Sequence, residues 1–142
     1  MKHKRIGVVS GYFNPLHSGH LEYINEAKKN CCYLIAIINS DHQVSLKGSK
    51  PFMRELHRED IVKNLKSIDE TIISIDKEKT QCETLKLIRS LHPDSEICFF
   101  NSGDRKSGNL ESSESTTCKE HNILEIILDL PKIYSSSELL KI

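Results

Sequence analysis

The stretch RIGVVSGYFNPLHSGHLEYINEAKKN, residues 5–30, holds a strand-like run, a turn and a helix-like run in succession. The run RIGVVSG is rich in β-branched residues and closes on a glycine, which is typical of a buried strand. After the turn, Leu21, Ile24 and Ala27 recur at helical spacing, and lysines at the end suit a helix C-terminus. This order favours an α/β fold.

The same alternation continues along the chain. Strands are expected at residues 33–39, 70–75 and 96–101 and within 122–130. Helices are expected at residues 53–68, 82–92 and 135–142 and around residues 118–121. Residues 40–52 are polar and predict a loop that includes one helical turn. In the helix at 53–68, we expect Leu56, Ile61 and Leu65 to face inward.

The fold class follows from this alternation. Strand 33–39 is apolar at nearly every position, as in strands covered on both faces. We predict one α/β domain over residues 1–142, a Rossmann-like parallel five-stranded sheet with helices on both faces.

The composition excludes several classes of protein. A chain of 142 residues is long enough for one ordinary core, and 37% hydrophobic with 28% charged residues is typical of a soluble domain. The 20 basic and 20 acidic residues balance, so no overall charge points to nucleic acid or to an anionic membrane. No apolar run approaches the ~20 residues that span a bilayer, and the N-terminal run is too short for a secretory signal. We expect a cytoplasmic protein.

The cysteines predict free thiols. They are odd in number, form no C-x-x-C pair and fit no zinc template: Cys31, Cys32, Cys82, Cys98 and Cys118. Small buried hydrophobes are the favoured interpretation, and a redox or metal role is the alternative. We therefore predict no protein metal site.

Residues suited to binding anions follow the predicted strands. In open parallel sheets, ligands bind beyond the carboxyl ends of the strands. Four such stretches are GYFNPLHSGH at 11–20, LKGSK at 46–50, SGDR at 102–105 and KIYSSS at 132–137.

The first of these stretches has the chemistry of a phosphate site. Gly11 would let the chain turn, and His17 or Ser18 would cap the following helix, whose free N–H groups attract anions. His17 and His20 would lie on one side of that helix start and add donors for phosphate oxygens. The alternative is that one histidine caps the helix and the other packs.

This stretch resembles the H-x-G-H signature of the nucleotidyltransferase superfamily. The segments NSD, LKG and SGD and the serines near the C-terminus are similar to those of its heptose-1-phosphate adenylyltransferase and glycerol-3-phosphate cytidylyltransferase members. The resemblance implies that His17, His20 and Lys47 stabilise the triphosphate. It also implies a nucleotide-binding set: Gly11, Tyr12, Phe13, Gly19, Gly103, Asp104, Arg105, Ser135, Ser136 and Ser137.

Other predicted site residues keep two interpretations. Asn14, Lys50, Arg54 and Arg58 could bind the acceptor's phosphate. Arg54 and Arg58 share a helix face, and the alternative is a solvated surface paired with nearby carboxylates. Ser135 opens an S-x-x-E capping box and could serve only as a cap. The family arginine that precedes the C-terminal motif has Lys132 or Arg105 as its replacement.

The resemblance also implies an activity. The chain would transfer a nucleoside monophosphate from a nucleoside triphosphate, with Mg²⁺, to a phosphorylated small molecule and release pyrophosphate. ATP with a sugar 1-phosphate is favoured, and CTP with glycerol phosphate or a related phosphoalcohol is the alternative. A non-catalytic nucleotide-binding module is the second alternative. A homodimer would also fit the family.

Overall fold

The computed structural model describes residues 4–102 and 113–130 of the chain. Strands and helices alternate along it, and the elements are β1 (Arg5–Gly11), α1 (Ser18–Lys28), β2 (Tyr33–Ile38), α2 (Asp41–Leu46), α3 (Glu55–Lys63), β3 (Glu70–Ile73), α4 (Cys82–Leu91), β4 (Glu96–Ser102), α5 (Ser113–Glu120) and β5 (Ile123–Leu128). The closing helix expected at residues 135–142 lies outside the described residues.

The strands form one parallel sheet in the order β3-β2-β1-β4-β5. The predicted five-stranded α/β sheet is therefore confirmed. The chain moves outward from β1 to β3 on one side, then crosses back to β4 and moves outward to β5. β1 lies at the centre, beside the point where this direction reverses.

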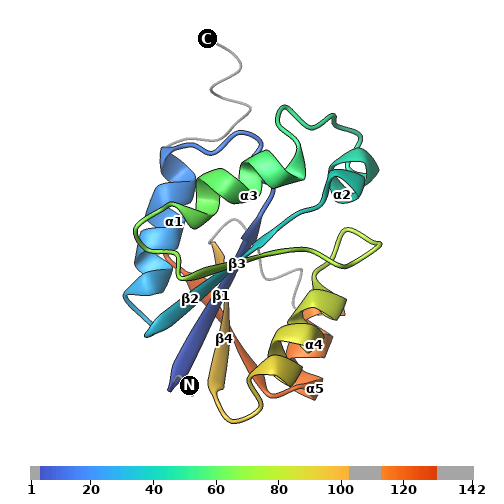
Figure 1. Ribbon diagram of the computed structural model, residues 1–142. Coiled ribbons are helices and arrows are strands. Elements are labelled where there is room, and N and C mark those ends of the chain that lie inside the picture. Colours follow the sequence, from blue (N-terminus) through green and yellow to red (C-terminus); the bar gives the residue numbers. More distant parts are fainter. Residues whose placement is uncertain (1–3, 103–112, 131–142) are drawn as a thin grey trace.

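Each face of the sheet is covered by helices (Figure 1). Tyr23 and Ile24 of α1 and Val62 of α3 pack with Val9 on one face. On the other face, helices α4 and α5 cover a second cluster that contains Leu85, Ile88 and Cys118. Alternate residues of β1 enter opposite clusters because side chains alternate across a strand.

The helical turn expected within residues 40–52 is a six-residue helix, α2, whose start is fixed by a capping box between Ser40 and Gln43.

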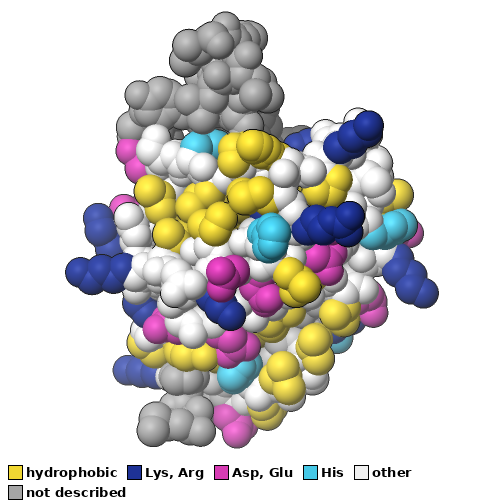
Figure 2. Space-filling model, turned by 45° about the horizontal axis from the view of Figure 1, so that its top comes forward, with side chains coloured by type: hydrophobic (Ala, Val, Ile, Leu, Met, Phe, Trp, Pro, Cys, Tyr) yellow, Lys and Arg dark blue, Asp and Glu magenta, His cyan; other side chains and the backbone are white. Residues whose placement is uncertain are grey.

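Helix α3 presents a different face to the core from the one predicted. Leu56 is 67% exposed and Ile61 is 40% exposed, whereas Arg58 and Val62 are completely buried. Leu65 does pack against the core, as predicted, but from beyond the end of α3 at Lys63. Figure 2 shows hydrophobic side chains gathered on the surface over α1 and α3.

The cysteines are all free thiols in the structure. Cys98 and Cys118 are buried, as predicted, but Cys32 is exposed. Among the described residues, none of the helices combines the length and hydropathy needed to cross a membrane.

Candidate active site

The sheet opens between β1 and β4 at their carboxyl ends. β1 pairs with β2 as far as Gly11 and Ile38, but its pairing with β4 ends at Val8 and Phe99. Tyr23 of α1 spans the opening, because its hydroxyl donates to the Phe100 carbonyl and accepts the Ser10 N–H at 3.4 Å. In open parallel sheets, ligands usually bind beyond the carboxyl ends of the strands at such a position.

The loop between β1 and α1 turns at Phe13. Phe13 has a φ of 50°, in the left-handed region, and its side chain is 1% exposed. Gly11 instead ends β1, where an added Cβ would lie 2.8 Å from the Phe13 ring. The turn expected at Gly11 instead lies at Phe13, and a side chain at position 11 would have to displace the buried Phe13 ring.

His17 and His20 form the capping box that starts α1. The Gly19 N–H donates to His17 Nδ1 at 3.1 Å, and the His17 N–H donates to His20 Nδ1 at 3.0 Å. His17 is thus the N-cap, in place of the alternative Ser18. Since each Nδ1 accepts a hydrogen bond, each neutral ring carries its proton on Nε2.

Both imidazoles are held neutral near pH 7. Burial lowers the pKa of His17, and burial together with the neighbouring His17 lowers the pKa of His20 to about 4. The two ring centroids are 3.9 Å apart, and Phe13 packs edge-on against His20 with centroids 5.0 Å apart. The pair can therefore offer two neutral N–H donors to an anion.

Lys47, which the resemblance implies as a triphosphate residue, lies beside this loop. It is the C-cap of α2, and its ammonium lies 4.4 Å from the centroid of the Tyr12 ring. Burial raises the pKa of Tyr12, and the negative charge of the Glu114 carboxylate contributes a smaller rise. Lys47 and the histidine loop thus approach the same edge of the sheet from two different elements.

Asn14 joins two loops. Its side-chain oxygen accepts the N–H groups of Phe52 at 2.6 Å and Met53 at 3.2 Å, and its amide donates to the Lys50 carbonyl at 3.2 Å. The peptide bond between Asn14 and Pro15 is cis. In this arrangement, Asn14 fixes residues 50–53 next to the histidine loop.

Arg58 has neither of its two predicted roles. Its guanidinium is buried and bonds to the carbonyls of Tyr12, Asn39 and Met53 and to the Asp41 carboxylate. It therefore does not form a shared surface with Arg54, which is exposed and caps α3 without a side-chain hydrogen bond. Lys50 is also exposed.

Several predicted nucleotide-binding residues fall outside the described residues: Gly103, Asp104, Arg105, Ser135, Ser136 and Ser137. Lys132, a candidate replacement for the family arginine, also lies outside them. Their roles stay predictions.

The structure adds residues that the sequence analysis missed. Gln81, at the start of α4, is 2% exposed, and its N–H donates to the buried Glu114 carboxylate at 2.8 Å. Its side-chain oxygen is a buried polar atom without a hydrogen-bond partner among the residues that the structure describes. Tyr23 is the other addition. Neither residue had a local sequence signal. Gln81 binds Glu114, which is 33 residues away, and Tyr23 binds Phe100 of β4, which is 77 residues away.

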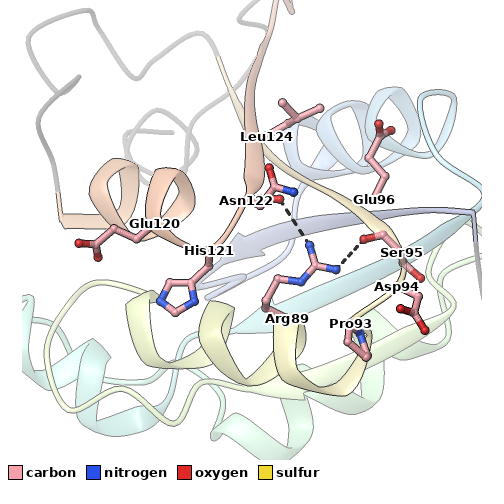
Figure 3. Close-up of a pocket in the computed structure, with 9 residues that line it drawn as sticks. All are labelled: Arg89, Pro93, Asp94, Ser95, Glu96, Glu120, His121, Asn122 and Leu124. Atoms are coloured by element: carbon pink, nitrogen blue, oxygen red, sulfur yellow. Dashed lines mark hydrogen bonds between the residues drawn. The ribbon is translucent and has the colours of Figure 1, made fainter.

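A cavity of about 640 Å³ lies at the opposite edge of the sheet, beside the first residues of β4 and β5 (Figure 3). Arg89 of α4 lines it and donates to the Ser95 carbonyl at 2.6 Å and the Asn122 carbonyl at 3.4 Å. Of the predicted substrate-binding residues that the structure describes, none lines this cavity. Within the part of the chain that the structure describes, no group of three His, Cys, Asp or Glu side chains could hold a metal ion.

Comparison with known proteins places the chain among nucleotidyltransferases. It is 33% identical over 95 residues to an FAD synthase of Thermococcus sibiricus. The aligned region covers 66% of this chain and 62% of that relative. It is 30% identical over 139 residues to the bifunctional protein HldE of Nitrobacter winogradskyi, covering 96% of the chain and 26% of that relative. The chain thus spans less than two thirds of either protein.

Solved structures and family models agree with the fold. The lipopolysaccharide core biosynthesis protein from Thermoplasma volcanium superposes with a TM-score of 0.67 at 21% identity, covering 91% of this chain and 98% of the other. The family model described as cytidylyltransferase-like matches residues 8–139, from β1 onward. Because this match spans nearly the whole chain and contains the histidine loop, the protein belongs to the cytidylyltransferase-like family of nucleotidyltransferases.

Proposed function

We propose that the protein transfers a nucleoside monophosphate from a nucleoside triphosphate to a phosphorylated small molecule and releases pyrophosphate. ATP is the favoured donor and a sugar 1-phosphate the favoured acceptor. Membership of the cytidylyltransferase-like family supports nucleotidyl transfer in general. The donor and the acceptor are the finer part of the proposal.

The observation that carries the proposal is the pair of neutral histidines at the start of α1. Both Nδ1 atoms are engaged with backbone N–H groups, so both Nε2–H groups remain for a ligand. Neutral donors fixed before the substrate arrives can stabilise charge that develops on phosphate oxygens without reorganising. Lys47 would add positive charge from the side of α2.

The proposed reaction needs no covalent intermediate. An acceptor phosphate oxygen attacks the α-phosphorus, and the bond from that phosphorus to the bridging oxygen breaks, so pyrophosphate leaves with the bonding electrons. Mg²⁺ enters as part of the substrate, the magnesium–triphosphate complex. The chain's own contribution is to orient the phosphates and to stabilise the charge on the departing pyrophosphate.

The choice of donor rests on likeness to relatives. FAD contains an adenine nucleotide, so the 33% identity to an FAD synthase supports ATP over CTP. HldE is a heptose-1-phosphate adenylyltransferase, and its match extends over 96% of the chain. This match supports a sugar 1-phosphate as the acceptor, as the NSD and LKG segments suggested. CTP with glycerol phosphate or another phosphoalcohol is the second candidate, and the cytidylyltransferase-like family match favours it.

Pyrophosphate release tests the proposal. The purified chain with Mg²⁺ should release pyrophosphate from ATP only when a suitable phosphorylated acceptor is present. A panel of ATP and CTP against sugar 1-phosphates, glycerol phosphate and flavin mononucleotide would identify the pair. Binding of nucleotide with no release for any pair would instead support a non-catalytic nucleotide-binding module.

A further inference from the structure

Arg58 connects three segments around the candidate site. Its Nη1 donates to the Tyr12 carbonyl at 2.8 Å and to the Asn39 carbonyl at 2.7 Å, and its Nε donates to the Met53 carbonyl at 2.9 Å. Its Nη2 donates to the Asp41 carboxylate at 2.7 Å. One planar group therefore binds the histidine loop, the segment that leads from β2 into α2, and the segment before α3 at once.

The segment beyond β2 carries Lys47. Asp41 is the first residue of α2, and this helix has only six residues, with Lys47 as its C-cap. Because α2 is a single short helix, fixing Asp41 at its start also constrains the position of Lys47 at its end. The Arg58 bonds to Tyr12 and Asp41 thus relate the position of Lys47 to that of the histidine loop.

Helix α3 holds Asp41 through a second contact. The Asp41 N–H donates to Glu55 Oε1 at 2.8 Å, one turn before Arg58 on the same helix. Backbone and side chain of Asp41 are therefore both bound by α3. These two contacts constrain the direction of α2 as well as its position.

Stability alone is a weak reason for this network. Burying a guanidinium removes it from water, and an apolar side chain in its place is often equally stable or more so. The four bonds of Arg58 instead fix geometry, because the planar fork of the guanidinium matches several acceptors at once and the single ammonium of lysine does not. The groups that accept these hydrogen bonds belong to the segments that bring His17, His20 and Lys47 together.

We propose that Arg58 is a positioning residue that sets the distance between Lys47 and the H-x-G-H loop. This inference rests on the proposed function, and it concerns how the two sides of the triphosphate site are aligned. Arg58 acts through Tyr12 and Asp41 and contacts no substrate. The Asp41 carboxylate completes the link on the side of α2.

Substitution of Arg58 tests the alignment. Arg58→Lys should lower kcat by about 10- to 100-fold in protein that is still folded, because small misplacement of a charged group costs this much. The KM for the triphosphate should change less than kcat. Arg89→Lys is the matched control. Arg89 also binds backbone carbonyls, at the opposite edge of the sheet (Figure 3), so its substitution should lower the melting temperature and leave kcat unchanged.

A double-mutant cycle with Lys47→Ala separates positioning from general loosening. In the Arg58→Lys background, Lys47→Ala should change kcat by less than about threefold, because Lys47 no longer sits where it acts. In the Arg89→Lys background, Lys47→Ala should keep its full effect. A full effect of Lys47→Ala in both backgrounds would overturn the proposal.

Asp41→Asn repeats the test at a less buried position. The Asp41 side chain is 31% exposed, and asparagine keeps an oxygen that can accept from Arg58, so this variant should fold even if Arg58→Lys does not, and it should reproduce part of the loss of kcat. Failure of both variants to fold would assign the network to stability and refute the positioning role.

Calorimetric titration with ATP and CTP distinguishes the two levels of inference. A wild-type chain that neither binds nucleotide nor releases pyrophosphate would refute the proposed function and this inference with it. An active wild type whose Arg58 and Asp41 variants keep kcat within about twofold would refute only the positioning role.

Discussion

His17 and His20 each serve the helix and the candidate site at the same time. Their Nδ1 atoms cap the backbone of α1, and their Nε2–H groups remain for a ligand. Alanine at either position would remove both contributions together. Substitutions that keep the cap but lose the ring are therefore the informative ones.

His17→Asn should separate capping from catalysis. The asparagine oxygen can still accept the Gly19 N–H, so the melting temperature should stay near that of the wild type. The Nε2–H donor is lost, and kcat should fall by about 10²–10³-fold, the range for one preorganised donor. Alanine at position 17 should show the same loss and a further destabilisation of about 0.5–2 kcal/mol. Full turnover in the asparagine variant would remove His17 from the proposed mechanism.

His20 should make the protein less stable as the pH falls. Burial lowers the pKa of His20 to about 4, whereas an unfolded histidine titrates near about 6.5. Above that pH the ring is neutral in both the folded and the unfolded chain, so His20 does not lower the free energy of unfolding. Below it, the unfolded chain binds a proton that the folded chain does not, so stability is lost progressively as the pH falls toward 4.

The matched variant for this pH effect is His20→Gln, which keeps an acceptor for the His17 N–H and removes the titrating group. Urea unfolding at pH 7.5 and pH 4.5 should show a smaller loss of free energy in the variant than in the wild type. An equal loss in both proteins would show that His20 is not the group responsible.

Lys47→Ala should lower kcat more than it raises the KM for the triphosphate. Charge on the leaving phosphates grows in the transition state, so a lysine that acts there affects kcat most. Lys50→Ala is the neighbouring comparison, and its effect should appear in the KM for the acceptor. Steady-state kinetics of both variants decide this. A change in the triphosphate KM alone would place Lys47 in ground-state binding.

At the scale of single elements, α2 and α3 decide how the site is assembled. Helix α2 begins at a capping box and is tied to the loop after β3, because the Gln43 amide donates to the carbonyls of Glu78 at 2.7 Å and Thr80 at 3.0 Å. Helix α3 begins at Glu55 and turns its buried face toward the site through Arg58. The two helices therefore depend on polar contacts as much as on apolar packing.

Ser40→Ala should weaken α2. The Ser40 hydroxyl accepts the Gln43 N–H at 3.1 Å, and loss of such a cap costs about 0.5–2 kcal/mol in the free energy of unfolding. Ser45→Ala, on the exposed side of the same helix, is the control and should change stability by less than about 0.5 kcal/mol. Equal effects of the two substitutions in denaturant titrations would contradict a capping role.

These two helices also show where sequence patterns were insufficient. The Ser40–Gln43 spacing is an S-x-x-Q box, and it could have predicted α2 despite the polar composition. The buried face of α3 had no such signal. An arginine is expected at the surface, so apolar spacing favoured Leu56 and Ile61, and the partners that bury Arg58 come from distant segments.

At the scale of the whole molecule, strand identity was predictable and strand order was not. Each strand is a short apolar run with local boundaries, and the predicted ranges agree with β1 to β5 within a few residues. The order β3-β2-β1-β4-β5 depends on which edges meet in space. For the same reason the sequence identified the histidine loop but not its turn at Phe13 or the bridge from Tyr23.

The thiols should report the packing of the whole domain. Cys32 is exposed and should react with a thiol reagent within the native protein. Burial raises the pKa of Cys98 and raises that of Cys118 to about 12, so both should react slowly until the chain unfolds. Titration in denaturant should count five thiols, and a chelator should leave the melting temperature unchanged. Rapid reaction of five native thiols would contradict the two buried clusters.

The bridge from Tyr23 has a consequence for how the carboxyl ends of β1 and β4 move relative to each other. The Ser10 N–H is held by a phenol instead of a neighbouring strand. A side chain can rotate away without breaking the sheet, so this amide should exchange with deuterium through a small local opening. Amides in the middle of β1 should exchange only through larger openings. The exchange rate of the Ser10 amide would then report how often the carboxyl ends of β1 and β4 separate, and whether a bound nucleotide makes this separation rarer.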